Sequence, residues 1–442
     1  MTEATGPKTV EQFASAFDQL ESKGEFHDQN GLKEVRRSAI NRFSKLGLPN
    51  TRQEDWRFTS VAPLAQHQFQ VATPGAQADL DGTNYKLLSG LTSIRMVFVN
   101  GFFSAELSKL DGIPSGVTVG SLQRSLEARP PAIERYLTKL ITDPDHPFVA
   151  LNTAMFQDGA YVHVLENAVI EEPIHLLFLA TSPAGAIVSH PRNLIVAERH
   201  SQATIVETYA GVDGEIYLTN AVTEVAVAQD AVIDHYRYQQ ESRSAFHFNT
   251  LEIKQERASN FSTQAVTFGG GLVRNDISFT LAGEGCLSTM NGLYQIGGKQ
   301  HVDNHTRIDH AHPRCESHEF YKGILDGQAR GVFNGKIMVR QIAQKTNAKQ
   351  TNRNLLLSQQ ALINTNPQLE IFADDVKCTH GATIGQLDKT QLYYLRARGI
   401  PMEEARRILT YAFANDVVEK IKLEPLRVEL ERQVLSSQAV QG

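Results

Sequence analysis

Cysteine is scarce in this sequence. Its 442 residues contain three cysteines, Cys286, Cys315 and Cys378, at wide spacings. An odd number of distant cysteines argues against a disulfide framework and is typical of a protein that works in a reducing compartment. Because no Cys-x-x-Cys pair is present, the sequence also excludes a closed, cysteine-rich zinc site.

A surplus of positive charge and long apolar runs are missing as well. The net charge is -6 with a pI near 6.2, which argues against nucleic acid or anionic lipid as partners. The first seventeen residues lack the basic flank and apolar run of a secretory signal, and no segment reaches the length of a transmembrane helix. We therefore expect a globular, cytoplasmic protein with no nucleic-acid partner and no membrane insertion.

No complete nucleotide-binding motif is present. The segment "GLYQIGGKQ" has Gly298 where a phosphate-binding loop needs lysine, and "RGVFNGKIM" has Arg330 where the first glycine is needed. The glycines of "FGGGLV" lack the strand–turn–helix setting of a dinucleotide fingerprint. We expect no nucleotide site in this chain itself.

The N-terminal region, residues 1–90, is predicted to be helical and to end in a linker. Apolar residues three or four apart, from Leu32 to Leu46, lie on one helix face, and Gly47 followed by Pro49 is a stop signal. The polar, turn-rich stretch between Thr73 and Gly90 is typical of a linker.

Residues 91–388 have the sequence pattern of short β-strands. Runs such as "IRMVFVNGFF", "IHLLFLAT" and "NLIVAE" alternate with turn residues, and a weak repeat recurs at steps of 29, 28, 26, 29, 31 and 33 residues. The repeat predicts a mainly β protein built as a parallel β-helix, because one coil of a solenoid buries its apolar face only against its neighbours. An antiparallel sandwich or barrel is the rival architecture. The equivalent points of the repeat are Val196, Val225, Ile253, Phe279, Ile308, Val339 and Phe372.

The C-terminal region, residues 389–442, is predicted to be helical. Pro401 followed by two glutamates is a helix start, and a second helix is predicted over "RVELERQVLSSQ". An apolar stripe includes Ile408, Leu409 and Phe413, followed by Val417. The stripe packs either as a cap on the end of the solenoid or as a docking surface for another protein.

Five histidines gather between residues 301 and 318. Imidazole and thiolate are good metal ligands, so His305, His310 and His312 could serve a stand-alone metal-dependent enzyme with a β-helix or cupin-like fold. The pair His310 and His312 would share a strand face. Histidines without metal are the simpler interpretation, because no HExxH arrangement accompanies them. The cluster comprises His301, His305, His310, His312 and His318.

The segment "DDVKCTHGATIG" places Cys378 two residues before His380. In an extended strand both side chains project from one face, while Lys377 and Thr379 lie on the other and Asp375 falls in a turn. One thiol and one imidazole supply half of the four ligands of an iron–sulfur cluster. The pair is either half of a shared metal site or a buried cysteine beside a hydrogen-bonded histidine.

Several longer segments together resemble the SufB/SufD family of iron–sulfur cluster assembly scaffolds. Within that family, the Cys-x-His-Gly-Ala-Thr pattern at residues 378–383 resembles the SufD-like branch. The resemblance spans nearly the whole chain. The matching segments are "RQEDWRFT", "VFVNG", "YKGIL", "GVFNGKI", "AQKTNAKQTNRNLLLS", "PQLEIFADDVKCTHGATIGQLD" and "LYYLRARGIP".

The resemblance implies a right-handed parallel β-helix between helical ends and a non-catalytic scaffold subunit of a SufBCD complex. It implies that Cys378 and His380 contribute to a nascent iron–sulfur cluster at an interface with SufB. It further implies that the C-terminal helices dock the SufC ATPase, that sulfur donor proteins act indirectly, and that reduced FAD belongs to the whole complex. Because a flat solenoid edge invites pairing, we also expect a homodimer when the chain is isolated. The partner-docking residues carried over are Arg396, Ile408, Leu409 and Phe413.

Overall fold

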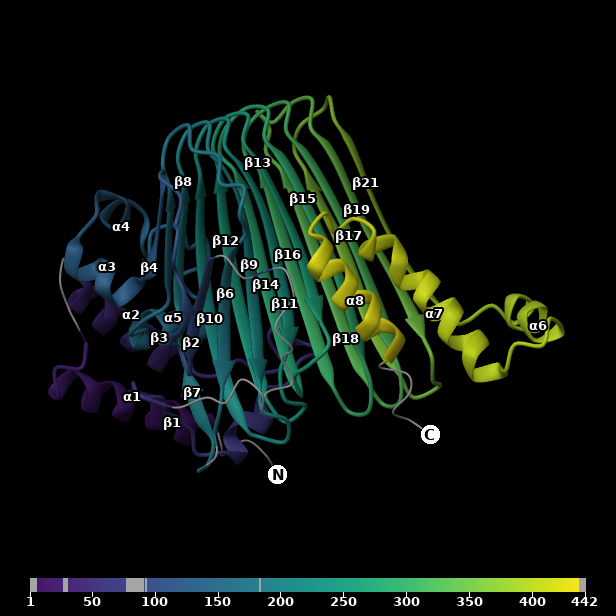
Figure 1. Cartoon of the computed structure of the whole chain (residues 1–442), viewed down its shortest axis with the longest axis horizontal. Coiled ribbons are helices and arrows are strands. Elements are labelled where there is room, and N and C mark those ends of the chain that lie inside the picture. Colours follow the sequence, from purple (N-terminus) through teal and green to yellow (C-terminus); the bar gives the residue numbers. More distant parts are fainter. Residues whose placement is uncertain (1–5, 27–30, 77–90, 92–93, 183, 437–442) are drawn as a thin grey trace.

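A two-sheet solenoid forms the body of the protein in the computed structural model (Figure 1). The structure describes residues 6–26, 31–76, 91, 94–182 and 184–436. The predicted linker between residues 73 and 90 therefore lies largely outside the described residues.

Helices and short segments precede the solenoid. Helix α2 (Leu32–Leu46) confirms the predicted apolar face, since Ala39 and Phe43 are buried. Gly47 ends this helix with a φ of 68°, and its N–H donates to the Phe43 carbonyl. Left-handed φ values suit glycine, which explains the stop signal. The other early elements are α1 (Gly6–Ser22), η1 (Glu54–Trp56), η2 (Ala62–Gln66) and β1 (Gln70–Val71).

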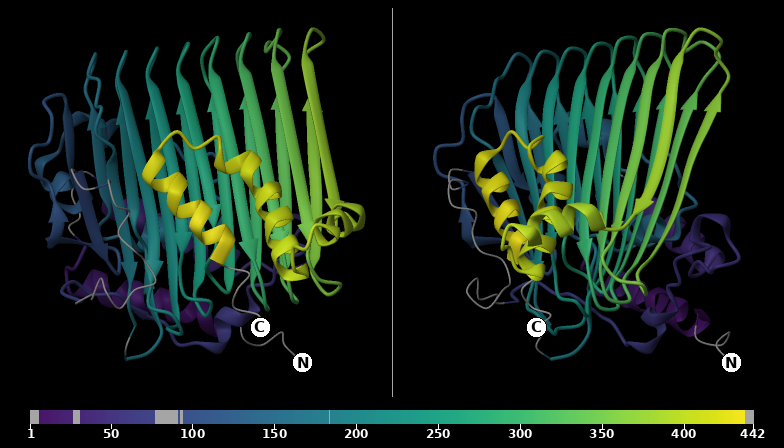
Figure 2. Two further views of the ribbon diagram at one scale, coloured as in Figure 1. Left: turned by 45° about the vertical axis from the view of Figure 1, so that its right-hand side comes forward. Right: turned by 90° about the vertical axis from the view of Figure 1, so that its right-hand side faces the viewer.

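The chain then alternates between two sheets, so that each coil contributes one strand to each (Figures 1 and 2). Sheet A contains β4 (Val117–Ser121), β5 (Ala160–Val164), β7 (Ile187–Ser189), β8 (Arg192–Ala197), β10 (Tyr217–Val227), β12 (Phe246–Gln255), β14 (Leu272–Leu281), β16 (His301–His310), β18 (Arg330–Val339) and β20 (Leu362–Ile371), and β1 pairs with β7. Sheet B contains β2 (Ile94–Val99), β3 (Phe102–Lys109), β6 (Ile174–Ala180), β9 (Gln202–Gly211), β11 (Val232–Gln240), β13 (Asn260–Thr267), β15 (Leu287–Ile296), β17 (Glu316–Leu325), β19 (Asn347–Leu356) and β21 (Lys377–Gly385). Almost all pairs are parallel, which confirms the predicted β-helix and excludes the sandwich.

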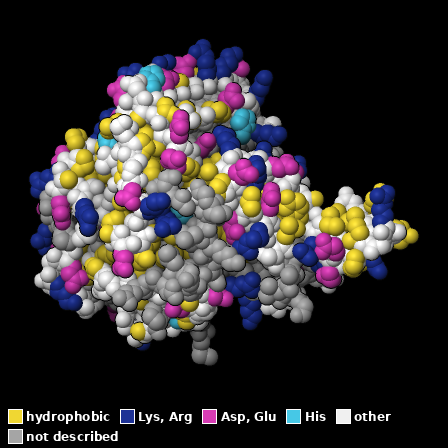
Figure 3. All heavy atoms as spheres, viewed as in Figure 1, with side chains coloured by type: hydrophobic (Ala, Val, Ile, Leu, Met, Phe, Trp, Pro, Cys, Tyr) yellow, Lys and Arg dark blue, Asp and Glu magenta, His cyan; other side chains and the backbone are white. Residues whose placement is uncertain are grey.

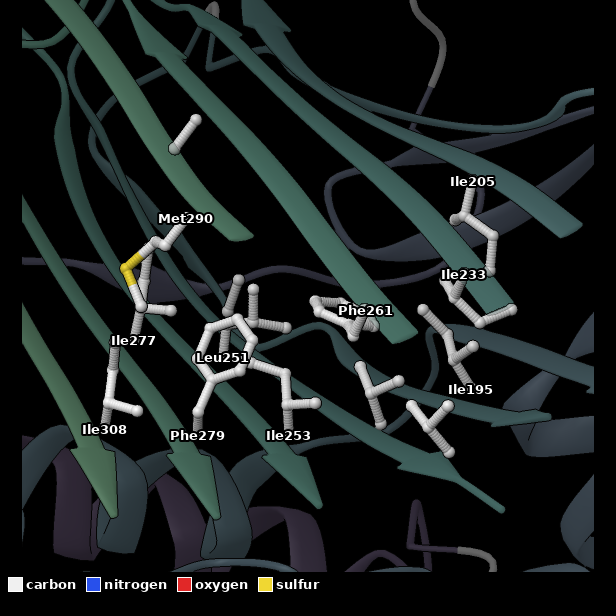
Figure 4. Packing of buried hydrophobic residues seen from close by; sticks show 14 of the residues in the cluster. Ile195, Ile205, Ile233, Leu251, Ile253, Phe261, Ile277, Phe279, Met290 and Ile308 are labelled. Atoms are coloured by element: carbon white, nitrogen blue, oxygen red, sulfur yellow. The ribbon is translucent and has the colours of Figure 1, made fainter. Parts of the chain in front are cut away.

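Columns of apolar side chains fill the space between the sheets. Val225, Ile253, Phe279 and Ile308 are register partners on successive strands, as the repeat predicted, and all are buried. Figure 4 shows three of these residues side by side with side chains from the facing sheet. Stacking of this kind is what makes each coil depend on its neighbours.

Three points of the predicted repeat are out of register. The partner of Val225 on β8 is Ile195, one residue before Val196. The partner of Ile308 on β18 is Ile337, two residues before Val339. Phe372 lies beyond the end of β20, where Leu369 occupies the column.

Part of the solenoid interior is polar. Asn249, Asn275 and Asn304 form a column on sheet A, and Asn275 donates to Asn304 over 2.9 Å. From sheet B, the buried guanidinium of Arg237 donates to Asn275 over 2.5 Å. The bond between Arg237 and Asn275 joins the two sheets across the interior, so it helps to fix how they face each other.

Helices also occur within the described part of residues 91–388, namely α3 (Leu122–Ala128), α4 (Pro131–Tyr136) and α5 (Pro147–Met155). Helix α5 packs between α2 and the solenoid, and eight of its nine residues are buried. Because it is apolar all round, it lacks the amphipathic period that reveals a surface helix.

The C-terminal region contains α6 (Lys389–Ala397), α7 (Met402–Val418) and α8 (Glu424–Ser436). Helices α7 and α8 cover the outer face of sheet B, where Val417, Val418 and Leu426 join an apolar cluster with strand residues (Figure 1). The two predicted C-terminal helices are thereby confirmed. No helix among the described residues combines the length and apolar character needed to cross a membrane.

Candidate functional site

The Cys378–His380 pair lies on β21, the last strand of sheet B. Among the described strands, β21 pairs only with β19, in parallel. Cys378 is the register partner of Ala348, and His380 is that of Gln350. Ala348 and Gln350 are buried in the interior, so this face of β21 continues the inner face of the sheet. Both side chains therefore stand at the open end of the solenoid.

The two side chains differ in burial. Cys378 packs against the interior apolar cluster and is half-buried, whereas His380 is exposed. Burial raises the pKa of the Cys378 thiol, and a hydrogen bond with the backbone of Ala348 partly offsets the rise. The thiol is therefore predominantly protonated near neutral pH, and a metal ligand at this position must release a proton on binding.

The turn before β21 is held by Asp375. Its carbonyl accepts from the backbone N–H of Lys345 over 2.7 Å, and its carboxylate forms an ion pair with the same lysine. Asp375 thus belongs to the turn, as expected, and fixes where β21 begins.

The open end of the solenoid is apolar as well as unpaired. β20 and β21 have no further neighbour in their sheets among the described strands. Large apolar side chains are exposed on these strands and the turn after β20, and Phe372 is 63% exposed. An unpaired sheet edge with exposed apolar side chains is a surface for another chain. The residues are Leu362, Ile371, Phe372 and Ile384.

No three His, Cys, Asp or Glu side chains of the described residues come together in a way that could hold a metal ion. Cys286 and Cys315 are buried in turns away from β21, and their thiols donate to backbone carbonyls. Within the described residues, Cys378 and His380 thus have no third ligand beside them.

The histidines between residues 301 and 318 lie in different places in the structure. His301 and His305 lie on the outer face of sheet A, where His305 pairs with Asp303 over 3.1 Å. His310 is buried in the interior and bonded to Ser317 over 2.9 Å. The expectation that His310 and His312 share a strand face is wrong, because β16 ends at His310. His305, His310 and His312 do not form one site.

The four partner-docking residues have different settings. Arg396 on α6 is exposed, and Ile408 on α7 is 38% exposed. Leu409 is half-buried. Phe413 faces the solenoid instead, since its carbonyl accepts from Lys322 Nζ over 2.5 Å and its ring lies 4.3 Å from that atom.

Helix α6 projects from the body of the molecule, and no residue in it is buried. Figure 3 shows this projection with apolar side chains on its surface. Tyr393 is 76% exposed and Tyr394 is also exposed. Sequence reasoning missed these two tyrosines, although adjacent aromatic residues in a short polar helix are themselves a signal of a binding surface.

The "RQEDWRFT" segment has a structural role. Trp56 is buried, with the guanidinium of Arg274 over its ring at 4.2 Å. Arg274 also donates to the Asp55 carbonyl over 2.7 Å and to Asp303 over 2.8 Å. These contacts fasten the N-terminal segment to sheet A beside a polar cleft of about 620 Å³, on a different surface from the Cys378–His380 pair.

Two models of known protein families match this chain. Residues 178–413 match the SufBD core domain of the SUF system for FeS cluster assembly, and residues 7–176 match the SufBD protein N-terminal region. The chain belongs to the SufBD family. Family membership supports a role for the chain in iron–sulfur cluster assembly.

Named relatives cover most of this SufBD chain. An iron–sulfur cluster assembly SufBD family protein of Synechocystis sp. is 36% identical over 92% of this chain and 91% of the relative. The iron–sulfur cluster assembly protein SufD of Escherichia coli is 30% identical over 87% and 88%. Protein ABCI7, chloroplastic, of Arabidopsis thaliana is 31% identical over 91% and 85%.

Proposed function

We propose that this protein is a non-catalytic scaffold subunit on which an iron–sulfur cluster is assembled together with a SufB partner. Cys378 and His380 supply one side of the nascent cluster site, and SufB supplies the other. The cluster is the cargo of this site and leaves for a recipient protein.

The observation that supports this proposal is an incomplete ligand pair on an open sheet edge. Cys378 and His380 share the inner face of β21, which has a neighbour on one side only in the part of the chain that the structure describes. An iron–sulfur cluster needs about four protein ligands, mostly thiolates. A partner strand beside β21 and β20 would bring further ligands and cover the exposed apolar side chains at the same time.

We assign the docking of the SufC ATPase to the C-terminal helices. Helix α6 and the exposed face of α7 offer Tyr393, Arg396 and Ile408 to a partner. Aromatic residues and arginine are enriched where protein surfaces bind one another. Phe413 acts indirectly in this proposal, since it fixes α7 on the solenoid.

The remaining chemistry belongs to the complex. ATP hydrolysis would come from SufC, sulfur would arrive from donor proteins of the SUF system, and reduced FAD would bind at the level of the complex. We place this work in the cytoplasm, since the three cysteines are all free thiols.

The test is anaerobic reconstitution of the complex of this chain with SufB and SufC. We expect the double variant Cys378→Ala, His380→Ala to lower cluster yield by about tenfold or more, because loss of direct ligands exceeds the effect of losing their supporting groups. Thr379→Ala is the matched control, since Thr379 lies between the two on the opposite face of the strand.

Wild-type cluster yield from the double variant would refute the site. Circular dichroism and co-purification with SufB would show that the double variant still folds and binds, so that a loss of yield reports on the ligands themselves.

A further inference from the structure

The interior of the solenoid holds a buried polar side chain directly next to His380 in register. Gln350 on β19 is 1% exposed and is the register partner of His380. Parallel strands lie about 4.8 Å apart, so side chains of one rung on one face are immediate neighbours. Gln350 is therefore the cross-strand neighbour of His380 on the inner face.

Glu319 determines which way the Gln350 amide points. Glu319 on β17 occupies the next rung, and Gln350 Nε2 donates to its carboxylate over 2.8 Å. Burial raises the pKa of Glu319 to about 7, so at pH 8 the group is mainly a carboxylate, whose oxygen accepts the amide N–H and would repel the amide oxygen. Gln350 Oε1 is left buried and without a hydrogen-bond partner among the described residues.

Gly335 makes room for this amide from the opposite sheet. A Cβ atom added at Gly335 would lie 2.3 Å from Gln350 Nε2 and 3.0 Å from its Oε1. The glycine of the "GVFNGKI" segment, which resembles part of a phosphate-binding loop, thus serves the packing of Gln350. Three elements, β17, β18 and β19, hold one carboxamide in place.

A buried carbonyl oxygen without a partner is costly, and an exposed imidazole one rung away is the nearest ring N–H donor in register. Among the described residues Gln350 Oε1 has no partner, so a bond to His380 requires the exposed imidazole to turn toward it. We propose that Gln350 is a positioning residue for His380: after that turn its Oε1 accepts a hydrogen bond from one ring N–H of His380, and Glu319 and Gly335 hold the amide for that bond. The inference rests on the proposed role of His380 as a cluster ligand. Fixing the N–H on one ring nitrogen leaves the other nitrogen's lone pair for iron.

The test measures the tautomer of His380 in the isolated full-length protein. Long-range ¹⁵N–¹H correlation spectra at pH 8 report which ring nitrogen of the neutral imidazole holds the proton. We expect Gln350→Met to change the tautomer ratio by about two- to tenfold, the factor that one ordinary hydrogen bond gives. Gln341→Met, in the exposed turn after β18, is the matched control and should leave the ratio unchanged.

Glu319→Gln provides a second variant of nearly identical shape. This variant allows either orientation of the Gln350 amide. We therefore expect the tautomer ratio of His380 to change in the same direction as in Gln350→Met, but by a smaller factor. An unchanged ratio in folded Gln350→Met protein overturns the inference. If that variant does not fold, an unchanged ratio in Glu319→Gln overturns it instead.

The tautomer experiment and the reconstitution experiment test different roles and can fail independently. Normal cluster yield from the His380 variant would refute the ligand role, whatever the tautomer shows. An unchanged tautomer would refute the positioning role, while the yield experiment would still decide whether His380 binds the cluster.

Discussion

Single side chains of this protein are kept in unusual protonation states by burial. Glu252 on β12 lies on the outer face of sheet A under the segment before α5, where Thr142 Oγ1 donates to its two carboxylate oxygens over 3.0 and 2.9 Å. Burial raises the pKa of Glu252 to about 8, a rise that the Thr142 hydrogen bonds only partly offset. The carboxyl is therefore largely protonated at neutral pH in the folded protein.

The raised pKa of Glu252 predicts that stability falls as pH rises. Below about pH 4.5 the group is protonated in both states, and between pH 4.5 and 8 the unfolded chain releases a proton that the folded protein keeps. Across that range we expect the free energy of unfolding of the native protein to fall by a few kcal/mol. Glu252→Gln should not show this fall, because its side chain does not titrate. Urea midpoints at pH 5 and pH 8 measure the difference between the two proteins.

Glu106→Gln is the control for this prediction, because Glu106 is exposed on β3. An equal change of midpoint with pH in the native protein and in Glu252→Gln would show that Glu252 is not the group responsible.

Gly335 provides a second prediction at the level of one residue. We expect Gly335→Ala to destabilise the protein by about 1–3 kcal/mol, because the new methyl group displaces the Gln350 amide in a packed interior. Chemical denaturation measures this change. Gly381→Ala is the control, since no atom lies within 4 Å of a Cβ added there.

At the scale of elements, one buried lysine fastens α7 to the solenoid. The Lys322 side chain is buried on the outer face of β17, and its Nζ donates to Asp416 over 2.6 Å as well as to the Phe413 carbonyl. Burial lowers the pKa of Lys322, and the bond to Asp416 opposes that change. The contact holds the proposed docking helix against the solenoid.

We expect Lys322→Met to loosen α7 and α8 without unfolding the solenoid. Hydrogen bonds to a charged group contribute about 1.5–3 kcal/mol, so amide exchange in residues 402–436 should accelerate by about tenfold or more. Hydrogen–deuterium exchange read by mass spectrometry measures this. Lys349→Met is the control on the exposed face of β19, and equal exchange in both variants would contradict the role of Lys322.

The sequence predicted the stacked strands where alternation was clean and missed the register where it was not. β8 is buried on both faces, so nothing in its pattern separates Ile195 from Val196. On β18, Ile337 and Val339 both face the interior, and a slip of two residues leaves the pattern intact. The period of the repeat thus revealed the architecture, while register needed the structure.

The candidate site also has one part that the sequence predicted and another that needed the structure. Spacing within one strand placed Cys378 and His380 on one face, because strand periodicity is local. Gln350 and Glu319 lie one and two coils earlier, and only stacking of coils brings them beneath His380. On α7, Ala405 and Ala414 are buried, and Ala414 packs with strand residues of the solenoid, while Ile408 remains exposed.

At the scale of the whole molecule, the two ends of the solenoid differ. The first coils end in the antiparallel pairs β2–β3 and β4–β5, with α3 and α4 beside them. The last coil ends in β20 and β21 with exposed edges, which Figure 2 shows facing the viewer in its right-hand view. One end is covered and the other is open.

The open end predicts self-association of the isolated protein. We expect a dimer by light scattering across a range of concentrations, and Phe372→Asp should shift it to monomer, because a charge in an apolar interface is costly. Val169→Asp is the control, since Val169 is equally exposed but lies beside the first coils. A native protein that is monomeric at every concentration would contradict the prediction.

The covered first end limits the size of any assembly built on this surface. A repeating structure that could accept neighbours at both ends would polymerise into fibres, because each addition would create a new site for the next. Here the antiparallel strands and the helices of the first coils prevent further addition. Two copies joined at their open edges therefore present no edge to which a third copy could pair. The same asymmetry allows a protein made of stacked, nearly identical coils to remain a discrete particle in the crowded cell.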